Sequence, residues 1–292
     1  MGAQTMELSR RGFLKRTAGG LAAAAAVAAG REPAPQAQQP VRVGMCDWNL
    51  GSTGNVQAVQ RAKEIGLDGV EASVEPNSGD RGLRNPERLK AYRDAAAAAV
   101  IAIPSVALGV LNSVPLKSEP KAALWLADSI SVAHDLGAKC ILIAFFGDGG
   151  LDMGDQRGIA RVVDVLKDLA PRAQEADVIL GLENTLSAED NLKIMAACGD
   201  HPYLQVYYDF KNSAGRDLVA EVKMLKGRIC QVHLKNGDKL LSQIDNVDWP
   251  TCAQALKEID YRGWYVLETS APSGDLVKDT RANTDYVRRT FG

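Results

Sequence analysis

From residue 41 onward, short apolar runs alternate with longer segments whose apolar residues recur at helical spacing. The apolar runs have the length of buried strands and are followed by polar or glycine-containing loops. They predict strands at residues 41–46, 68–72, 101–108, 139–145, 178–183, 204–210, 229–235 and 264–269. The intervening segments predict helices at residues 56–65, 85–99, 118–136, 156–176, 187–198, 216–226, 249–259 and 275–291.

Strands that are apolar on both faces and alternate with helices indicate a parallel sheet. Eight such units in residues 41–292 fit a single-domain (β/α)₈, or TIM, barrel. The alternative is an open, doubly wound sheet, which usually carries a glycine-rich phosphate loop after its first strand. Residues 46–54 occupy that position and lack the GxGxxG spacing, so we favour the barrel.

Four consecutive predicted strands end on an ionisable residue: Glu183, Asp209, His233 and Glu268. In a parallel barrel these ends meet at one face, where neighbouring strands lie about 5 Å apart. Three carboxylates gathered there would repel one another unless a cation lay between them. The four residues therefore predict a site for one divalent metal ion. Oxygen-rich ligation with one imidazole suits Mn²⁺ or Mg²⁺ best, with Co²⁺ or Zn²⁺ possible.

The N-terminal segment differs from the rest of the chain. Residues 9–15 read Ser-Arg-Arg-Gly-Phe-Leu-Lys, and residues 18–30 form an alanine-rich apolar run too short for a stable membrane span. This order resembles a twin-arginine export signal. We expect residues 1–37 to be a signal peptide and spacer, and the protein to be periplasmic or extracellular, with no membrane association after cleavage.

Composition excludes some classes of function. The chain has 292 residues and a net charge of −2, and residues 38–292 contain 29 basic and 34 acidic residues. A mildly acidic body argues against nucleic acid as a partner. The five cysteines are scattered without a CxxC pair, so we interpret them as small buried residues rather than as a zinc site or a disulfide framework.

The strand ends also carry a family resemblance. They read Gly-Leu-Glu-Asn-Thr at 181–185, Tyr-Tyr-Asp-Phe-Lys-Asn at 207–212, Gln-Val-His-Leu-Lys at 231–235 and Leu-Glu-Thr-Ser at 267–270. The chain resembles the sugar phosphate isomerase/epimerase group of the xylose isomerase-like barrels. That resemblance implies that Glu183, Asp209, His233 and Glu268 bind one divalent metal and that the two glutamates shuttle the substrate proton. Relatives are often dimers or tetramers, which makes a homo-oligomer possible.

This resemblance implies an isomerase or epimerase acting on a small carbohydrate. Removing a proton next to a carbonyl creates an enediolate, which a metal ion stabilises as a Lewis acid. A glutamate on each side of the substrate can remove and return that proton. Which of Glu183 and Glu268 is the base depends on the substrate.

Two positions depart from the family pattern, and they alter the expected sugar contacts. Many epimerases have a histidine where this chain has Asn212, and an arginine shortly after the strand-seven histidine, where the nearest basic residues are Lys235 and Lys239. Lys235 is a candidate to hold a substrate oxygen or protonate a leaving hydroxyl, with a solvated loop lysine as the alternative. The other candidate substrate residues are Asn212, Trp48, Asn112 and Glu71, and for Glu71 a salt-bridge role is equally expected.

Two further functions remain open. A lyase or dehydratase would start with the same proton abstraction and then expel a hydroxyl or glycosyl group from a keto-sugar. A sugar-binding barrel without catalysis is the alternative from another class, and it would not need the metal ligands. Endonuclease IV-type barrels bind three metal ions with many histidines. That arrangement fits poorly, because this chain has only three histidines in total.

Overall fold

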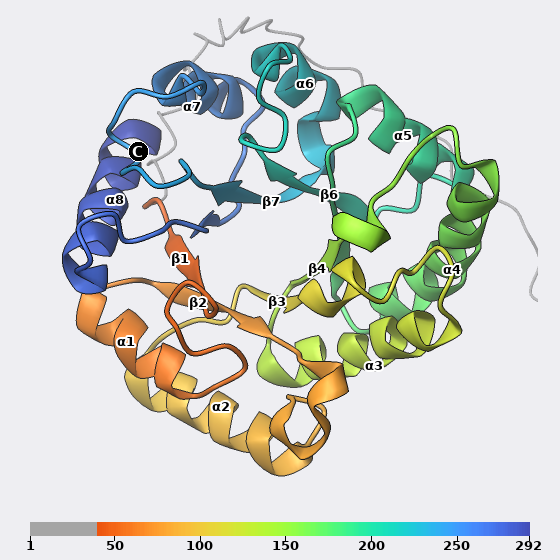
Figure 1. Cartoon of the computed structure of the whole chain (residues 1–292), viewed down its shortest axis with the longest axis horizontal. Helices are drawn as coiled ribbons and strands as arrows, with labels where there is room; N and C mark the ends of the chain where they lie inside the picture. Colours follow the sequence, from red (N-terminus) through yellow and green to blue (C-terminus); the bar gives the residue numbers. More distant parts are fainter. Residues whose placement is uncertain (1–39) are drawn as a thin grey trace, which may run out of the picture. The chain divides into compact units, whose positions relative to one another are not determined.

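A computed structural model describes residues 40–292, which form a closed barrel of eight parallel strands surrounded by helices (Figure 1). The strands are β1 (Val43–Cys46), β2 (Gly69–Ser73), β3 (Ser105–Leu108), β4 (Cys140–Ala144), β5 (Ile179–Glu183), β6 (Leu204–Asp209), β7 (Ile229–Leu234) and β8 (Tyr265–Leu267). The helices are α1 (Gln57–Ile65), α2 (Pro86–Ala99), α3 (Pro120–Leu136), α4 (Gln156–Glu175), α5 (Ala188–Ala197), α6 (Leu218–Leu225), α7 (Trp249–Glu258) and α8 (Leu276–Phe291). Short 3₁₀ turns are η1 (Pro76–Arg81), η2 (Gly109–Asn112), η3 (Gly147–Gly149) and η4 (Lys226–Arg228). The predicted (β/α)₈ barrel is confirmed.

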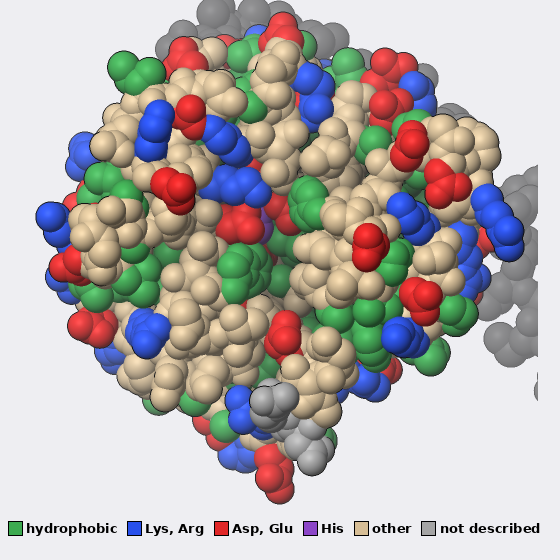
Figure 2. Space-filling view, in the orientation of Figure 1, with side chains coloured by type: hydrophobic (Ala, Val, Ile, Leu, Met, Phe, Trp, Pro, Cys, Tyr) green, Lys and Arg blue, Asp and Glu red, His purple; other side chains and the backbone are tan. Residues whose placement is uncertain are grey.

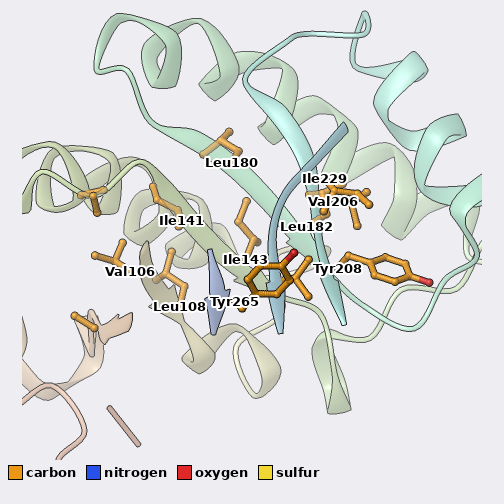
Figure 3. Packing of buried hydrophobic residues seen from close by; sticks show 14 of the residues in the cluster. Val106, Leu108, Ile141, Ile143, Leu180, Leu182, Val206, Tyr208, Ile229 and Tyr265 are labelled. Carbon is orange, nitrogen blue, oxygen red and sulfur yellow. The ribbon is translucent and has the colours of Figure 1, made fainter. Parts of the chain in front are cut away.

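The main hydrophobic core lies between the strands and the helices. Outward-facing strand residues such as Leu180, Leu182 and Val206 are buried there (Figure 3). The amphipathic helices cover them, and α4 buries Val162, Leu166 and neighbouring apolar residues along one face. This layer holds the helices against the barrel. The strand residues that face the barrel interior can therefore be polar.

The barrel interior is a second, smaller and partly polar core. Several contacts join strands that are not neighbours in the sheet and must therefore pass through the interior. Tyr207 on β6 reaches Glu71 on β2, and Gln231 on β7 reaches Ser105 on β3. A small apolar cluster around Leu142 shares this space. The interior is thus a packed core, as expected for an eight-stranded barrel.

One irregularity sets which side chains face inward on β7. Val206 pairs with Ile229, but the next residue, Tyr207, pairs with Gln231, so Cys230 is an extra residue on β7. Beyond this shift Asp209 lies directly opposite His233. An unshifted register would place Val232 opposite Asp209 and turn His233 away from the interior, because successive strand residues point to opposite faces.

Most element boundaries agree with the sequence expectations, with one local difference at the third strand. The third strand begins at Ser105 rather than at residue 101, because Pro104 has no N–H to donate to a neighbouring strand. Pro171 lies inside α4 without ending it. The expected export signal at residues 1–37 lies outside the described residues, and between residues 40 and 292 no helix is long and apolar enough to cross a bilayer.

Gly181 on β5 provides a test of the interior packing. A Cβ at this position would lie 2.9 Å from Cys230 Sγ and 3.0 Å from Cys140 Sγ. We expect Gly181→Ala to lower the free energy of unfolding by about 1–3 kcal/mol through overpacking, measured by urea denaturation. Gly227→Ala is the control, because its Cβ would meet open space. Adding Cys230→Ala should restore part of the loss, and equal stability of Gly181→Ala and wild type would contradict this packing.

Candidate metal centre and active-site pocket

The structure brings the four predicted ligands together at the carboxyl ends of the strands. Glu183 is the last residue of β5 and Asp209 the last of β6, while His233 lies on β7 and Glu268 follows β8. One potential ligand atom from each of the four lies within 4.8 Å of the others. The spacing is short enough for all four to contact one ion.

His233 is fully buried at the floor of this group. Its Nδ1 is 3.0 Å from Glu183 Oε1 and 3.6 Å from Glu268 Oε2. Its Nε2 points to the opposite side, 3.1 Å from Glu71 Oε1. The ring therefore offers Nδ1 to the carboxylate cluster.

Asp209 supplies the test of whether a cation fits. Its Oδ1 accepts hydrogen bonds from the backbone N–H groups of Lys211 and Asn212, at 2.7 and 3.0 Å, which orients the carboxylate. Its Oδ2 is buried and lies 2.9 Å from Lys235 Nζ, but it has no correctly aligned hydrogen-bond donor among the described residues. A buried carboxylate oxygen without a hydrogen bond is costly. A bound divalent cation would satisfy it, so the residues fit the metal that the donor set implies.

A pocket of about 270 Å³ opens directly above the cluster. In the space-filling view, acidic side chains and a histidine meet in a hollow near the centre of this face (Figure 2). The pocket is lined by Trp48, Thr53, Ser73, Glu75, Ala107, Gly109, Asn112, Leu142, Ala144, Phe146, Glu183 and Glu268. None of these is lysine or arginine.

Three of the predicted substrate residues lie at this pocket. Trp48 and Asn112 line it, and Asn212 Nδ2 is 3.5 Å from Glu183 Oε1 at its edge. Glu71 does not line it. Its side chain is fully buried beneath His233, because β2 directs it into the barrel interior. The structure therefore places Glu71 apart from the pocket-lining candidates, with its Oε1 3.1 Å from His233 Nε2.

The sequence of residues 59–290 matches the xylose isomerase-like TIM barrel family. The chain belongs to this family. No curated protein matches it at a significant level.

Solved structures share the fold of this xylose isomerase-like barrel at low sequence identity. A D-allulose 3-epimerase from Methylomonas sp. is 16% identical, with a TM-score of 0.70 over 87% of this chain and 99% of its own. An L-ribulose 3-epimerase is 18% identical, with a TM-score of 0.71 over 86% and 94% of the two chains. A 3-keto-D-glucoside 4-epimerase from E. coli is 15% identical, with a TM-score of 0.69 over 85% and 99%.

The two glutamates of this xylose isomerase-like barrel have different electrostatic surroundings. Burial raises the pKa of Glu183 to about 7, against the opposing effect of His233. Burial also acts to raise the pKa of Glu268, but the positive charges of His233 and Lys235 outweigh it and bring the pKa below its usual value. Carboxyl groups whose pKa values are pushed apart are typical of acid–base pairs.

Lys235 lies within the carboxylate cluster rather than in solvent. Its Nζ is 2.8 Å from Glu268 Oε2 and 2.9 Å from Asp209 Oδ2, and about a quarter of the side chain is exposed. The position therefore differs from the solvated loop lysine that was the alternative. The ammonium group here pairs with two of the four candidate ligands.

Several residues of the site were missed by the sequence analysis. Thr53, Ser73 and Glu75 line the pocket from loops or strand ends whose direction the sequence does not fix. Tyr207 packs edge-to-face on His233, with ring centroids 4.5 Å apart. A signal for Tyr207 existed, since it is two residues before Asp209 on the same strand and therefore faces the same way.

Lys235→Met tests the electrostatics of the cluster. The positive charge of Lys235 repels a metal ion bound by the same carboxylates and so weakens its binding. Two unit charges 4 Å apart interact by about 4 kcal/mol at an effective dielectric constant of 20. Because Lys235 is partly exposed and flexible, we expect a smaller effect, about tenfold tighter Mn²⁺ binding in the variant. Titration of the metal-free protein with Mn²⁺ by electron paramagnetic resonance measures the Kd.

Lys239→Met is the matched control for this change. It removes the same charge from the same loop, but Lys239 is half-exposed and its nearest acidic partner is Asp245, 4.0 Å away. Its Kd for Mn²⁺ should equal that of wild type. Weaker Mn²⁺ binding by Lys235→Met would show that the lysine supports the site instead of opposing a cation.

Proposed function

We propose that the protein is a divalent-metal-dependent isomerase or epimerase of a sugar or sugar derivative. The observation that carries the proposal is the convergence of Glu183, Asp209, His233 and Glu268 within 4.8 Å at the floor of the pocket. Membership in the xylose isomerase-like family and the sugar epimerases among the structural neighbours support it. One of those neighbours, the Methylomonas D-allulose 3-epimerase, has been solved in complex with D-allulose.

The four residues would hold one divalent ion, Mn²⁺ or Mg²⁺ by preference and Co²⁺ or Zn²⁺ as alternatives. When bound, the ion would polarise a substrate carbonyl and stabilise the negative charge of an enediolate. Glu183 and Glu268 reach the pocket from β5 and from the end of β8, so they can face a substrate from two sides. We assign them the removal and return of the proton beside the carbonyl.

The pocket favours an uncharged carbohydrate. None of its lining residues is lysine or arginine, whereas three of them are Glu75, Glu183 and Glu268. A phosphate group would meet this acidic lining, and the nearby ammonium group of Lys235 is already paired with Asp209 and Glu268. Trp48 and Phe146 supply apolar surface for the faces of a sugar ring. We therefore place non-phosphorylated sugars first among the substrates.

The position of Lys235 supports a second candidate, a lyase or dehydratase that acts on a keto-sugar. Its ammonium group is held beside Glu268 by a 2.8 Å hydrogen bond. In that place it can donate a proton to an oxygen that leaves after the carbon proton has been removed. The two reactions share their first step and differ in whether a bond to oxygen breaks.

We also propose that the mature protein, residues 38–292, works in the periplasm or outside the cell. The support is the Arg-Arg-Gly-Phe-Leu-Lys order at residues 10–15 followed by the apolar run at residues 18–30. An uncharged sugar as substrate is compatible with that location.

Solvent exchange tests the proposed chemistry. The Mn²⁺-loaded protein is incubated in D₂O with free ketoses and with 3-keto-glycosides, and deuterium in the sugar is read by mass spectrometry. We expect wild type to incorporate one deuterium beside the carbonyl and both Glu183→Gln and Glu268→Gln to lose at least 10²-fold in rate, because each removes a proton carrier. An unsaturated or cleaved product would identify the lyase.

Glu189→Gln is the control for these variants, because it makes the same substitution at an exposed position in the first turn of α5. It should exchange at the wild-type rate. Tight sugar binding by the Mn²⁺-loaded protein without any exchange would contradict the proposal and indicate a binding role.

A further inference from the structure

Beneath the metal centre, Glu71 links His233 to a hydrogen-bonded network that crosses the barrel. Glu71 Oε1 is 3.1 Å from His233 Nε2. The other oxygen, Oε2, accepts hydrogen bonds from Ser105 Oγ at 2.5 Å and from Tyr207 OH at 2.7 Å. All four residues are almost completely buried, so water does not compete for these bonds.

Gln231 fixes the direction of the network. Its Nε2 donates to Ser105 Oγ at 2.6 Å and to Tyr207 OH at 2.7 Å. An amide nitrogen only donates, so each hydroxyl accepts a hydrogen bond from Gln231 and uses its own single hydrogen to donate a hydrogen bond to Glu71. The carboxylate of Glu71 thus receives two donors at Oε2, and Oε1 remains as the acceptor that faces the histidine ring.

This arrangement determines which ring nitrogen of His233 carries the proton. A carboxylate oxygen that only accepts requires a proton on Nε2. A metal ion held by Glu183 and Glu268, whose oxygens lie 3.0 and 3.6 Å from Nδ1, would take the place of the Nδ1 proton and leave a neutral ring that is protonated on Nε2. We propose that Glu71 is a positioning residue that holds His233 as the Nε2–H tautomer and so directs Nδ1 at the metal ion. The inference rests on the proposed metal-dependent function and adds a residue to it.

Cys46 allows one competing interpretation of the same contacts. Its Sγ is 3.4 Å from His233 Nε2 and 3.6 Å from Glu71 Oε1, and a thiolate, a carboxylate and an imidazole can together bind a metal. In that arrangement Nε2 would be the ligand atom. The hydrogen bonds from Ser105 and Tyr207, together with the complete burial of Cys46, Glu71 and His233, favour the hydrogen-bonded network. The experiment below separates the two.

Glu71→Gln tests the proposal with a side chain of almost the same size. If the new amide nitrogen faces Ser105 and Tyr207, its N–H group lies opposite two hydroxyl groups that donate hydrogen bonds at this position, and those hydrogen bonds are lost. If it faces His233, Nε2 must accept, and the proton moves to Nδ1, where it blocks the metal. Both orientations weaken the site, and we expect the Kd for Mn²⁺, measured by electron paramagnetic resonance, to rise 10- to 100-fold.

Glu221→Gln is the matched control. It makes the same substitution at another buried glutamate that accepts a tyrosine hydrogen bond, from Tyr208 OH at 3.0 Å, but Glu221 lies outside the metal cluster and its network, so the Kd for Mn²⁺ should stay within about threefold of wild type. Equal Kd values for Glu71→Gln and wild type, in a protein that binds Mn²⁺, would overturn the positioning role and leave the proposed function standing. A wild-type protein that takes up no Mn²⁺ would overturn both.

A second measurement uses protein that retains Glu71, so the proposal can be tested even if Glu71→Gln fails to fold. Nitrogen-15 NMR of the histidine rings is recorded on the Zn²⁺-loaded double variant His134→Gln/His201→Gln, which retains His233 as its single histidine. We expect a proton on Nε2 and zinc on Nδ1. Zinc on Nε2, with or without Cys46, would overturn the proposal.

Discussion

The electrostatic constraint at the mouth of the barrel governs the rest of this structure. A closed parallel barrel brings the ends of all its strands to one face, and four of those ends carry Glu183, Asp209, His233 and Glu268. Three carboxylates within 4.8 Å of one another are unfavourable without positive charge between or beside them. In the protein chain itself that charge comes from Lys235 and from the histidine, and Asp209 still retains a buried oxygen without a hydrogen bond. The same imbalance makes the site suitable for a divalent cation.

Much of the fold, and the convergence of the four candidate ligands, was predictable because both depend on regular spacing. Apolar runs alternating with helical segments specify the (β/α)₈ order, and the residue that ends a strand is placed by the barrel itself. His233 illustrates the limit. Its inward direction depends on the extra residue Cys230 in β7, and a register shift of this kind leaves no local signature in an apolar run.

The role of Glu71 was also beyond what the sequence could predict. The sequence placed it at a strand end and left pocket lining and a salt bridge as equal expectations. Ser105 comes from the neighbouring strand β3, but Tyr207 comes from β6 across the barrel, so the pairing with Tyr207 depends on the closed three-dimensional arrangement. The position of the Lys235 side chain could not be predicted for a similar reason. The path of the loop after β7 decides whether this side chain reaches the carboxylates or solvent.

The central claim is that Glu183, Asp209, His233 and Glu268 form one site for one divalent ion. Elemental mass spectrometry of the folded protein, after saturation with Mn²⁺ and removal of unbound metal, tests it most directly. The account predicts close to one equivalent of Mn²⁺ per chain in wild type and a clear loss in both Asp209→Asn and His233→Ala. A native protein that retains no divalent ion, or variants that retain as much as wild type, would contradict it.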